Sequence, residues 1–171
     1  MNAFIESQFS NSSYPLVWMF CSKTLNNKIK SIHKRALRQV YLHFSNSFKE
    51  LLEKDNSVTV HQRNIQLVAI EMFKATKGLG PRIVRDLFVF DQNENRNREF
   101  HRPNVNNVYT GENSIRYFGP IVWDEMLPSE FKSIETLEKF KTAIKKWSPE
   151  NCPCSLCGEY VHGVGRVTTY E

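Results

Sequence analysis

The sequence predicts a mainly α-helical protein, with one small domain of about five helices, a short β-hairpin and a cysteine-rich C-terminal tail. Apolar residues recur at spacings of three and four along several stretches, which places them on one side of a helix. Residues that favour helix starts and helix ends bound those stretches. Hydrophobic residues make up 40% of the 171 residues and include twelve Phe, so the chain can build a core, which argues against wholesale disorder.

A long first helix is predicted over residues 22–41, with Ser22 at its N-cap. Five apolar residues fall on one stripe of this helix, and we expect them to face the core: Leu25, Ile29, Ile32, Ala36 and Val40. The opposite arc holds five basic residues: Lys28, Lys30, Lys34, Arg35 and Arg38. The first helix is therefore predicted to have one apolar side and one basic side.

Three more helices are predicted between residues 47 and 88. Ser47 is the expected cap of a short helix over residues 47–54, and a long helix follows over residues 60–77. Gly78 ends the long helix, and a short helix is predicted over residues 82–88. The buried side of the long helix is expected to consist of Ile65, Val68, Ala69, Met72 and Phe73.

The remaining elements are a loop, a hairpin and a last helix. Residues 91–104 are predicted to form a polar loop, and residues 105–118 a hairpin around a turn that contains glycine. A helix over residues 137–147 follows the expected cap Thr136. The helical domain is predicted to span residues 1–148, which leaves residues 149–171 as the cysteine-rich tail.

Positive charge gathers in the first third of the chain. The net charge is +5, and no Asp or Glu lies between Ser7 and Lys49, whereas seven Lys and Arg lie there if Lys49 is included. A basic segment on a near-neutral body favours a polyanionic partner. A helix of this length can follow phosphates over ~30 Å, so we expect RNA or DNA to bind its basic side. The alternative is a basic helix surface that only faces solvent.

Aromatic residues near the end of this helix offer a second type of contact. Tyr41, Phe44 and Phe48 can stack on unpaired bases. The alternative, which we favour for Phe48, is that these rings fill the core between helices.

Catalytic motifs are missing from the sequence. Its four aspartates are Asp55, Asp86, Asp91 and Asp124, and no two are adjacent. Two-metal phosphoryl transfer needs carboxylates that hold two ions about 4 Å apart, so we expect neither a magnesium site nor polymerase or nuclease activity. The most apolar run, residues 14–21, is far shorter than the ~20 residues of a membrane-spanning helix, so no membrane partner is expected.

The tail contains the residues that most resemble a metal site: Cys152, Cys154, Cys157 and His162. Two residues between Cys154 and Cys157 let both thiolates reach one tetrahedral zinc ion, and Cys152 and His162 complete a set of four ligands. Zinc is therefore the candidate cofactor, and the alternative is a terminal peptide with exposed thiols. No signal sequence is recognisable, so we expect a reduced intracellular setting, nuclear or cytoplasmic.

Several stretches, taken together and in order, resemble the C-terminal region of non-LTR (LINE-type, jockey-like) retrotransposon reverse transcriptases. The matching segments are 2–10 with 15–20, 25–29 with 32–38 and Val40-Tyr41, 47–52 with 60–64, Gly119-Pro120 with Trp123, Leu127-Pro128 and 137–141, and Trp147 and Pro149 with 151–157. The resemblance spans nearly the whole chain. Two departures, an expansion at residues 11–14 and a divergent end after Gly165, fit a decayed or truncated copy.

This resemblance implies a thumb-like helical region, after the polymerase palm, that grips a template–primer duplex. The basic side of the 22–41 helix is where we expect that grip. The catalytic aspartates of the family have no counterpart here, so the resemblance implies a piece of an RNA-directed DNA polymerase without activity of its own. Two alternatives stay open, namely a zinc-stabilised protein-interaction domain and an inert retrotransposon-derived fragment.

Overall fold

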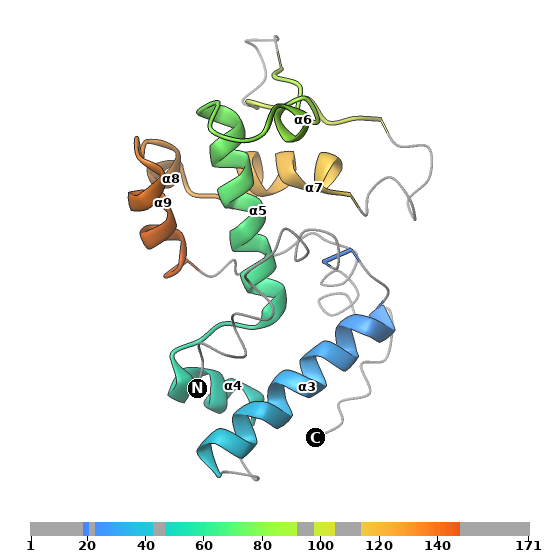
Figure 1. Ribbon diagram of the computed structural model, residues 1–171, viewed down its shortest axis with the longest axis vertical. Coiled ribbons are helices and arrows are strands. Elements are labelled where there is room, and N and C mark those ends of the chain that lie inside the picture. Colours follow the sequence, from blue (N-terminus) through green and yellow to red (C-terminus); the bar gives the residue numbers. More distant parts are fainter. Residues whose placement is uncertain (1–18, 21–22, 43–46, 92–97, 105–113, 148–171) are drawn as a thin grey trace. The chain divides into compact units, whose positions relative to one another are not determined.

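A computed structural model of the chain describes residues 19–20, 23–42, 47–91, 98–104 and 114–147. These residues form helices and no named strand within the described ranges, which confirms the predicted mainly α-helical class (Figure 1). The chain divides between Asn64 and Ile65 into two compact units, each described by itself below. The predicted boundary between residues 148 and 149 lies outside the described residues and stays a prediction.

The N-terminal unit contains α3 (Lys23–Tyr41) and α4 (Phe48–Asp55). Ser47 caps α4 as predicted, because its hydroxyl accepts a hydrogen bond from the Glu50 N–H at 3.2 Å, and the Glu50 carboxylate accepts one from the Ser47 N–H at 3.2 Å. The helix ends at Asn56, whose left-handed backbone (φ 51°) stops it. Local capping chemistry thus fixes both ends of α4.

The buried side of α3 differs from the predicted stripe. Leu25 and Ile32 are 49% and 57% exposed, whereas Leu37, outside the stripe, is only 4% exposed. The reason is the position of α4, whose Phe48 ring packs edge-on against His33 with centroids 5.4 Å apart. This contact turns the side of α3 that holds His33 and Leu37 inward. The expectation that Leu25 and Ile32 face the core is therefore wrong.

Helix α5 (Val60–Thr76) supplies the centre of the C-terminal unit from Ile65 onward. Its predicted core residues are all buried, as the sequence periodicity required: Ile65, Val68, Ala69, Met72 and Phe73. The helix ends where Gly78 takes a left-handed conformation (φ 68°) and the Leu79 N–H donates to the Lys74 carbonyl at 2.8 Å. A single turn, α6 (Arg82–Arg85), follows.

The rest of the C-terminal unit is helical as well. It contains α7 (Ile115–Ile121), a π-helix η1 (Val122–Met126), α8 (Ser129–Lys132) and α9 (Leu137–Ile144). Figure 1 shows α7, α8 and α9 gathered around the upper part of α5. The last helix agrees with the prediction at its start, whereas α8 was not predicted.

The predicted hairpin over residues 105–118 is wrong in its second arm. Residues 115–118 belong to α7, which begins where the Ser114 hydroxyl accepts a hydrogen bond from the Tyr117 N–H. Phe118 and Ile121 are buried, so this short apolar run is a buried helix, which periodicity alone cannot distinguish from a strand. Residues 105–113 lie outside the described residues. In the predicted polar loop, Phe100 pairs with Phe90 in a single antiparallel bridge.

Aromatic rings form the core of the C-terminal unit. Phe73 of α5 stacks on Phe140 of α9 with centroids 4.3 Å apart, and the Trp123 ring lies 6.3 Å from Phe140. A buried amide among them, Gln66, donates to the Trp147 carbonyl at 2.7 Å. The core therefore combines ring stacking with a satisfied polar group, as buried amides require.

Gly119 is closely packed, and this packing predicts a stability effect. A methyl group at this position would lie 2.7 Å from the Met72 sulfur and 3.0 Å from the Phe88 ring. Gly119→Ala should therefore lower the free energy of unfolding by about 1–2 kcal/mol, measured by urea unfolding. Gly80→Ala is the matched control, because its methyl group would meet nothing closer than 3.7 Å. Equal stability of the two variants would contradict this packing.

Candidate nucleic-acid interface

The net positive charge of the protein comes from residues 1–64. Residues 1–64 contain nine Lys and Arg against four Asp and Glu, whereas residues 65–171 contain fourteen of each. Helix α3 has no acidic residue at all over its length Lys23–Tyr41. No carboxylate of α3 itself therefore repels an anion bound along this helix.

The structure leaves the predicted basic residues of α3 accessible. Lys28, Lys30 and Arg35 are exposed, and Lys34 and Arg38 are half-buried. Lys28 and Arg35 are seven residues apart, which is close to two helical turns, so they lie on the same exposed side. Lys34 and Arg38 are four residues apart and flank that side. The helix therefore presents its cations in two adjacent rows along its axis.

Most of these cations have no acidic partner within the part of the chain that the structure describes. No carboxylate there forms a salt bridge with Lys28, Lys34, Arg35 or Arg38. The ammonium of Lys30 lies 6.0 Å from the centroid of the Phe48 ring. The other four basic side chains keep a positive charge that is available to an external anion, such as a phosphate.

The aromatic residues next to α3 are engaged inside the unit. The Tyr41 hydroxyl donates to the Asp55 carboxylate at 2.6 Å, and the Lys54 ammonium lies 5.2 Å from the Tyr41 ring centroid. The hydrogen bond to Asp55 raises the pKa of Tyr41 above its ordinary value of 10.0, with a smaller effect from burial. Phe48 packs on His33, as favoured from the sequence, while Phe44 lies outside the described residues.

The exposed side of α3 therefore offers cations and aliphatic groups. Leu25 and Ile32 are its exposed large apolar side chains, beside Lys28 and Arg35. Such a surface suits contacts with phosphates and sugars, which position a nucleic acid without reading its bases. Sequence reasoning missed the exposure of Leu25 and Ile32, because it depends on tertiary packing and not on the periodicity of α3.

The predicted zinc ligands Cys152, Cys154, Cys157 and His162 lie outside the described residues. Within the described ranges, no three His, Cys, Asp or Glu side chains gather as metal ligands would. In the same ranges, no helix combines the length and apolar character needed to cross a membrane.

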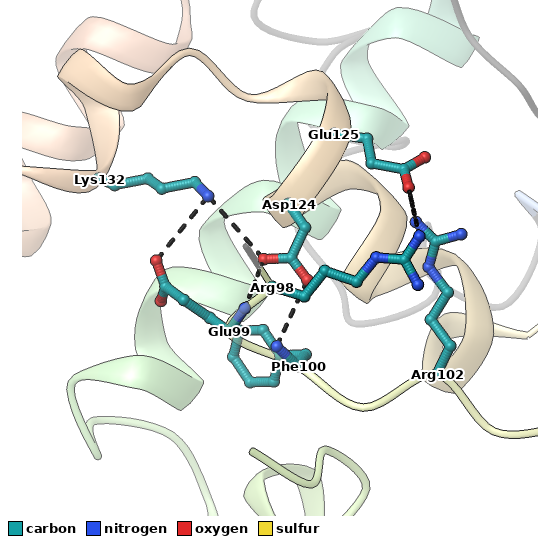
Figure 2. Close-up of polar contacts among 7 residues, drawn as sticks. All are labelled: Arg98, Glu99, Phe100, Arg102, Asp124, Glu125 and Lys132. Carbon is teal, nitrogen blue, oxygen red and sulfur yellow. Dashed lines mark hydrogen bonds and ion pairs between the residues drawn. The ribbon is translucent and has the colours of Figure 1, made fainter. Parts of the chain in front are cut away.

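Three of the four aspartates bind other side chains or backbone groups rather than one another. Asp55 accepts from Tyr41, and Asp86 lies 3.5 Å from the Arg82 guanidinium. The Asp124 carboxylate, whose side chain is 1% exposed, accepts from the backbone N–H groups of Glu99 at 3.0 Å and Phe100 at 3.3 Å. Figure 2 shows these two bonds, through which η1 holds the segment around Phe100.

Charged side chains surround Asp124. The Lys132 ammonium lies 3.9 Å from Asp124 and 3.8 Å from Glu99, while Arg98 and Arg102 both pair with Glu125 (Figure 2). Burial raises the pKa of Asp124 above its usual value, and the two backbone hydrogen bonds and the Lys132 charge oppose that rise. This carboxylate is therefore a structural acceptor, and no motif in the sequence indicated its role.

The raised pKa of Asp124 predicts a pH effect on stability. The folded protein binds the Asp124 proton more tightly than the unfolded chain does, so this group stabilises the fold at low pH. That contribution should disappear as the pH rises through the pKa of the folded state. Lys132→Met should raise the pKa further, because it removes an opposing charge, whereas exposed Lys146→Met should not.

Carboxyl carbon NMR, followed against pH, measures both effects. The expected midpoint for Asp124 lies above 3.8 in the unchanged protein and higher still in Lys132→Met. A midpoint below 3.8 in the unchanged protein would contradict the dominance of burial.

Comparison with known proteins assigns no family to the chain. No protein-family model, no curated protein and no solved structure matches it.

Proposed function

We propose that the protein binds nucleic acid, RNA or DNA, through the basic side of α3 and performs no catalysis by itself. The observation that supports this most directly is the set of cations on an acid-free helix: Lys28, Lys30, Lys34, Arg35 and Arg38. Four of them lack a carboxylate partner within the described residues, so phosphates would not have to displace one.

The ordered set of motifs supports a more specific origin. On that basis, the chain is a non-catalytic C-terminal fragment of a retrotransposon RNA-directed DNA polymerase, and the bound partner is a template–primer duplex. The absence of catalysis is supported by the partners of Asp55, Asp86 and Asp124, each of which is bound to a different group. An upstream reading frame that continues into Met1 and contains an adjacent aspartate pair would support this origin.

The dependence of binding on salt tests the proposed site. The logarithm of the association constant for a DNA duplex should fall with the logarithm of the salt concentration, with a slope of about −0.9 for each phosphate contacted. Lys28→Glu with Arg35→Glu should weaken binding and make that slope shallower by about two contacts. Both residues are exposed, so the fold should survive, and circular dichroism verifies this.

The matched control is Lys145→Glu with Lys146→Glu, which changes the charge by the same amount at exposed positions of the C-terminal unit. It should leave affinity nearly unchanged, apart from the smaller effect of net charge. Equal losses in the two double variants would reject α3 as the site. Binding that is independent of salt would reject an electrostatic interface altogether.

A second candidate, a zinc-stabilised protein-interaction domain, is favoured by the spacing of Cys154 and Cys157 alone. Metal analysis of the purified protein should then give about one zinc ion per chain, and Cys154→Ser with Cys157→Ser should remove it. Zinc well below one equivalent, and unchanged in that variant, would reject this site. If the chain fails to unfold cooperatively, the inert-fragment alternative gains support.

A further inference from the structure

Exposed apolar side chains concentrate in one short segment of the C-terminal unit. The described residues contain eight large hydrophobic side chains that are exposed, and five of them lie between residues 79 and 90. They are Leu79, Ile83, Leu87, Val89 and Phe90. Ile83, at 77%, is the most exposed of the eight. Scattered exposed apolar residues are ordinary, but a run of this density marks an interaction surface.

The segment is held firmly at its beginning. The left-handed Gly78 ends α5 with two hydrogen bonds, from the Leu79 N–H to Lys74 and from the Gly78 N–H to Ala75. Arg85 of α6 reaches back and donates to the Gly78 carbonyl at 3.3 Å. Helix α6 is thus tied to the end of α5, so Ile83 is presented from a fixed position.

The segment is anchored at its end as well. Phe88 is buried and contacts Phe100 edge-on, and Phe90 stacks on Phe100 with centroids 5.0 Å apart. The His101 N–H donates to the Val89 carbonyl at 2.8 Å. Because buried Phe88 alternates with exposed Leu87 and Val89, the exposed side chains cannot turn inward without removing Phe88 from the core.

The charges around this surface indicate what it binds. Between residues 77 and 90 the cations are Lys77, Arg82 and Arg85, all exposed, and the only acid is Asp86, which lies 3.5 Å from Arg82 and leaves the segment with a net positive charge. A second copy of the chain would bring like charges together, which disfavours self-association. Four of the five apolar side chains are aliphatic, whereas unpaired bases prefer aromatic rings. Apolar groups with a basic rim match an amphipathic partner that has acidic flanks.

We infer that residues 79–90 form a docking surface for an acidic amphipathic peptide segment of another protein. Its apolar side chains would cover Ile83 and Leu87, and its carboxylates would pair with Arg85 and, in place of Asp86, with Arg82. This surface lies in the C-terminal unit, whereas the polyanion site proposed on α3 belongs to the N-terminal unit.

Peptide selection on the full chain tests the inference. A displayed library of random 16-residue peptides is selected on the immobilised protein and counter-selected on the Ile83→Asp variant. Enriched peptides should have a net negative charge and large apolar residues three or four positions apart. A synthetic copy of the best peptide should bind at least roughly tenfold more weakly to Ile83→Asp and to Arg82→Glu. Both positions are exposed, and circular dichroism verifies that the variants fold.

Lys28→Glu with Arg35→Glu serves as the specificity control, and it should leave peptide binding unchanged. Enriched peptides that are neutral or basic, or no peptide that depends on Ile83, would overturn the inference. So would dimerisation seen by sedimentation, or binding to vesicles of phosphatidylcholine with phosphatidylserine, if Ile83→Asp abolished either one. Loss of single-stranded DNA binding in Phe90→Ala, with peptide binding absent, would overturn it in favour of base stacking.

Discussion

Phe48 and Asp55, at the two ends of α4, contact His33 and Tyr41 on one side of α3, and these contacts determine which side of α3 meets solvent. The edge-on ring contact and the hydrogen bond lie at positions eight residues apart on α3, so together they fix its rotation about its own axis. With that rotation set, Lys28 and Arg35 are exposed and Leu37 is buried. The proposed interface is therefore a consequence of helix packing as much as of charge content.

In the C-terminal unit, an aromatic core and one buried carboxylate have complementary roles. Phe73, Trp123 and Phe140 supply the apolar contact area, which is the larger favourable contribution to folding. Asp124 fixes the orientation of the neighbouring backbone, because its two oxygens accept hydrogen bonds from consecutive N–H groups. A core of rings alone would leave those N–H groups unpaired. The Trp123 indole N–H is satisfied as well, by the Glu99 carboxylate at 2.9 Å. Residues 98–100 are thus joined to η1 by polar bonds to Trp123, Asp124 and Glu125.

Local features of the sequence predicted local features of the fold. The start of α4 follows from Ser47 and the end of α5 from Gly78, because the preferences of both residues operate within one turn of helix. The buried side of α5 follows from the spacing of its apolar residues. The side of α3 that is buried could not be predicted, because Leu25 and Leu37 are chemically equivalent and only tertiary packing distinguishes them. The helix at residues 115–118 was mistaken for a strand, since a short apolar run fits both. The basic residues of the candidate site were predictable individually, whereas the lack of a carboxylate partner for Lys28, Lys34, Arg35 and Arg38 within the described residues required the structure.

The missing acids of α3 have a cost for the helix itself. Lys34 lies four residues after Lys30 and four before Arg38, so both pairs place like charges on neighbouring turns. Such pairs destabilise a helix by about 0.2–0.5 kcal/mol each, and no Asp or Glu within α3 compensates. An anion that settles along these turns removes the self-repulsion at the same time as it gains its own contacts. Occupancy of the helix and its resistance to melting are therefore thermodynamically linked, and a polyanion should act as a folding ligand for the N-terminal unit.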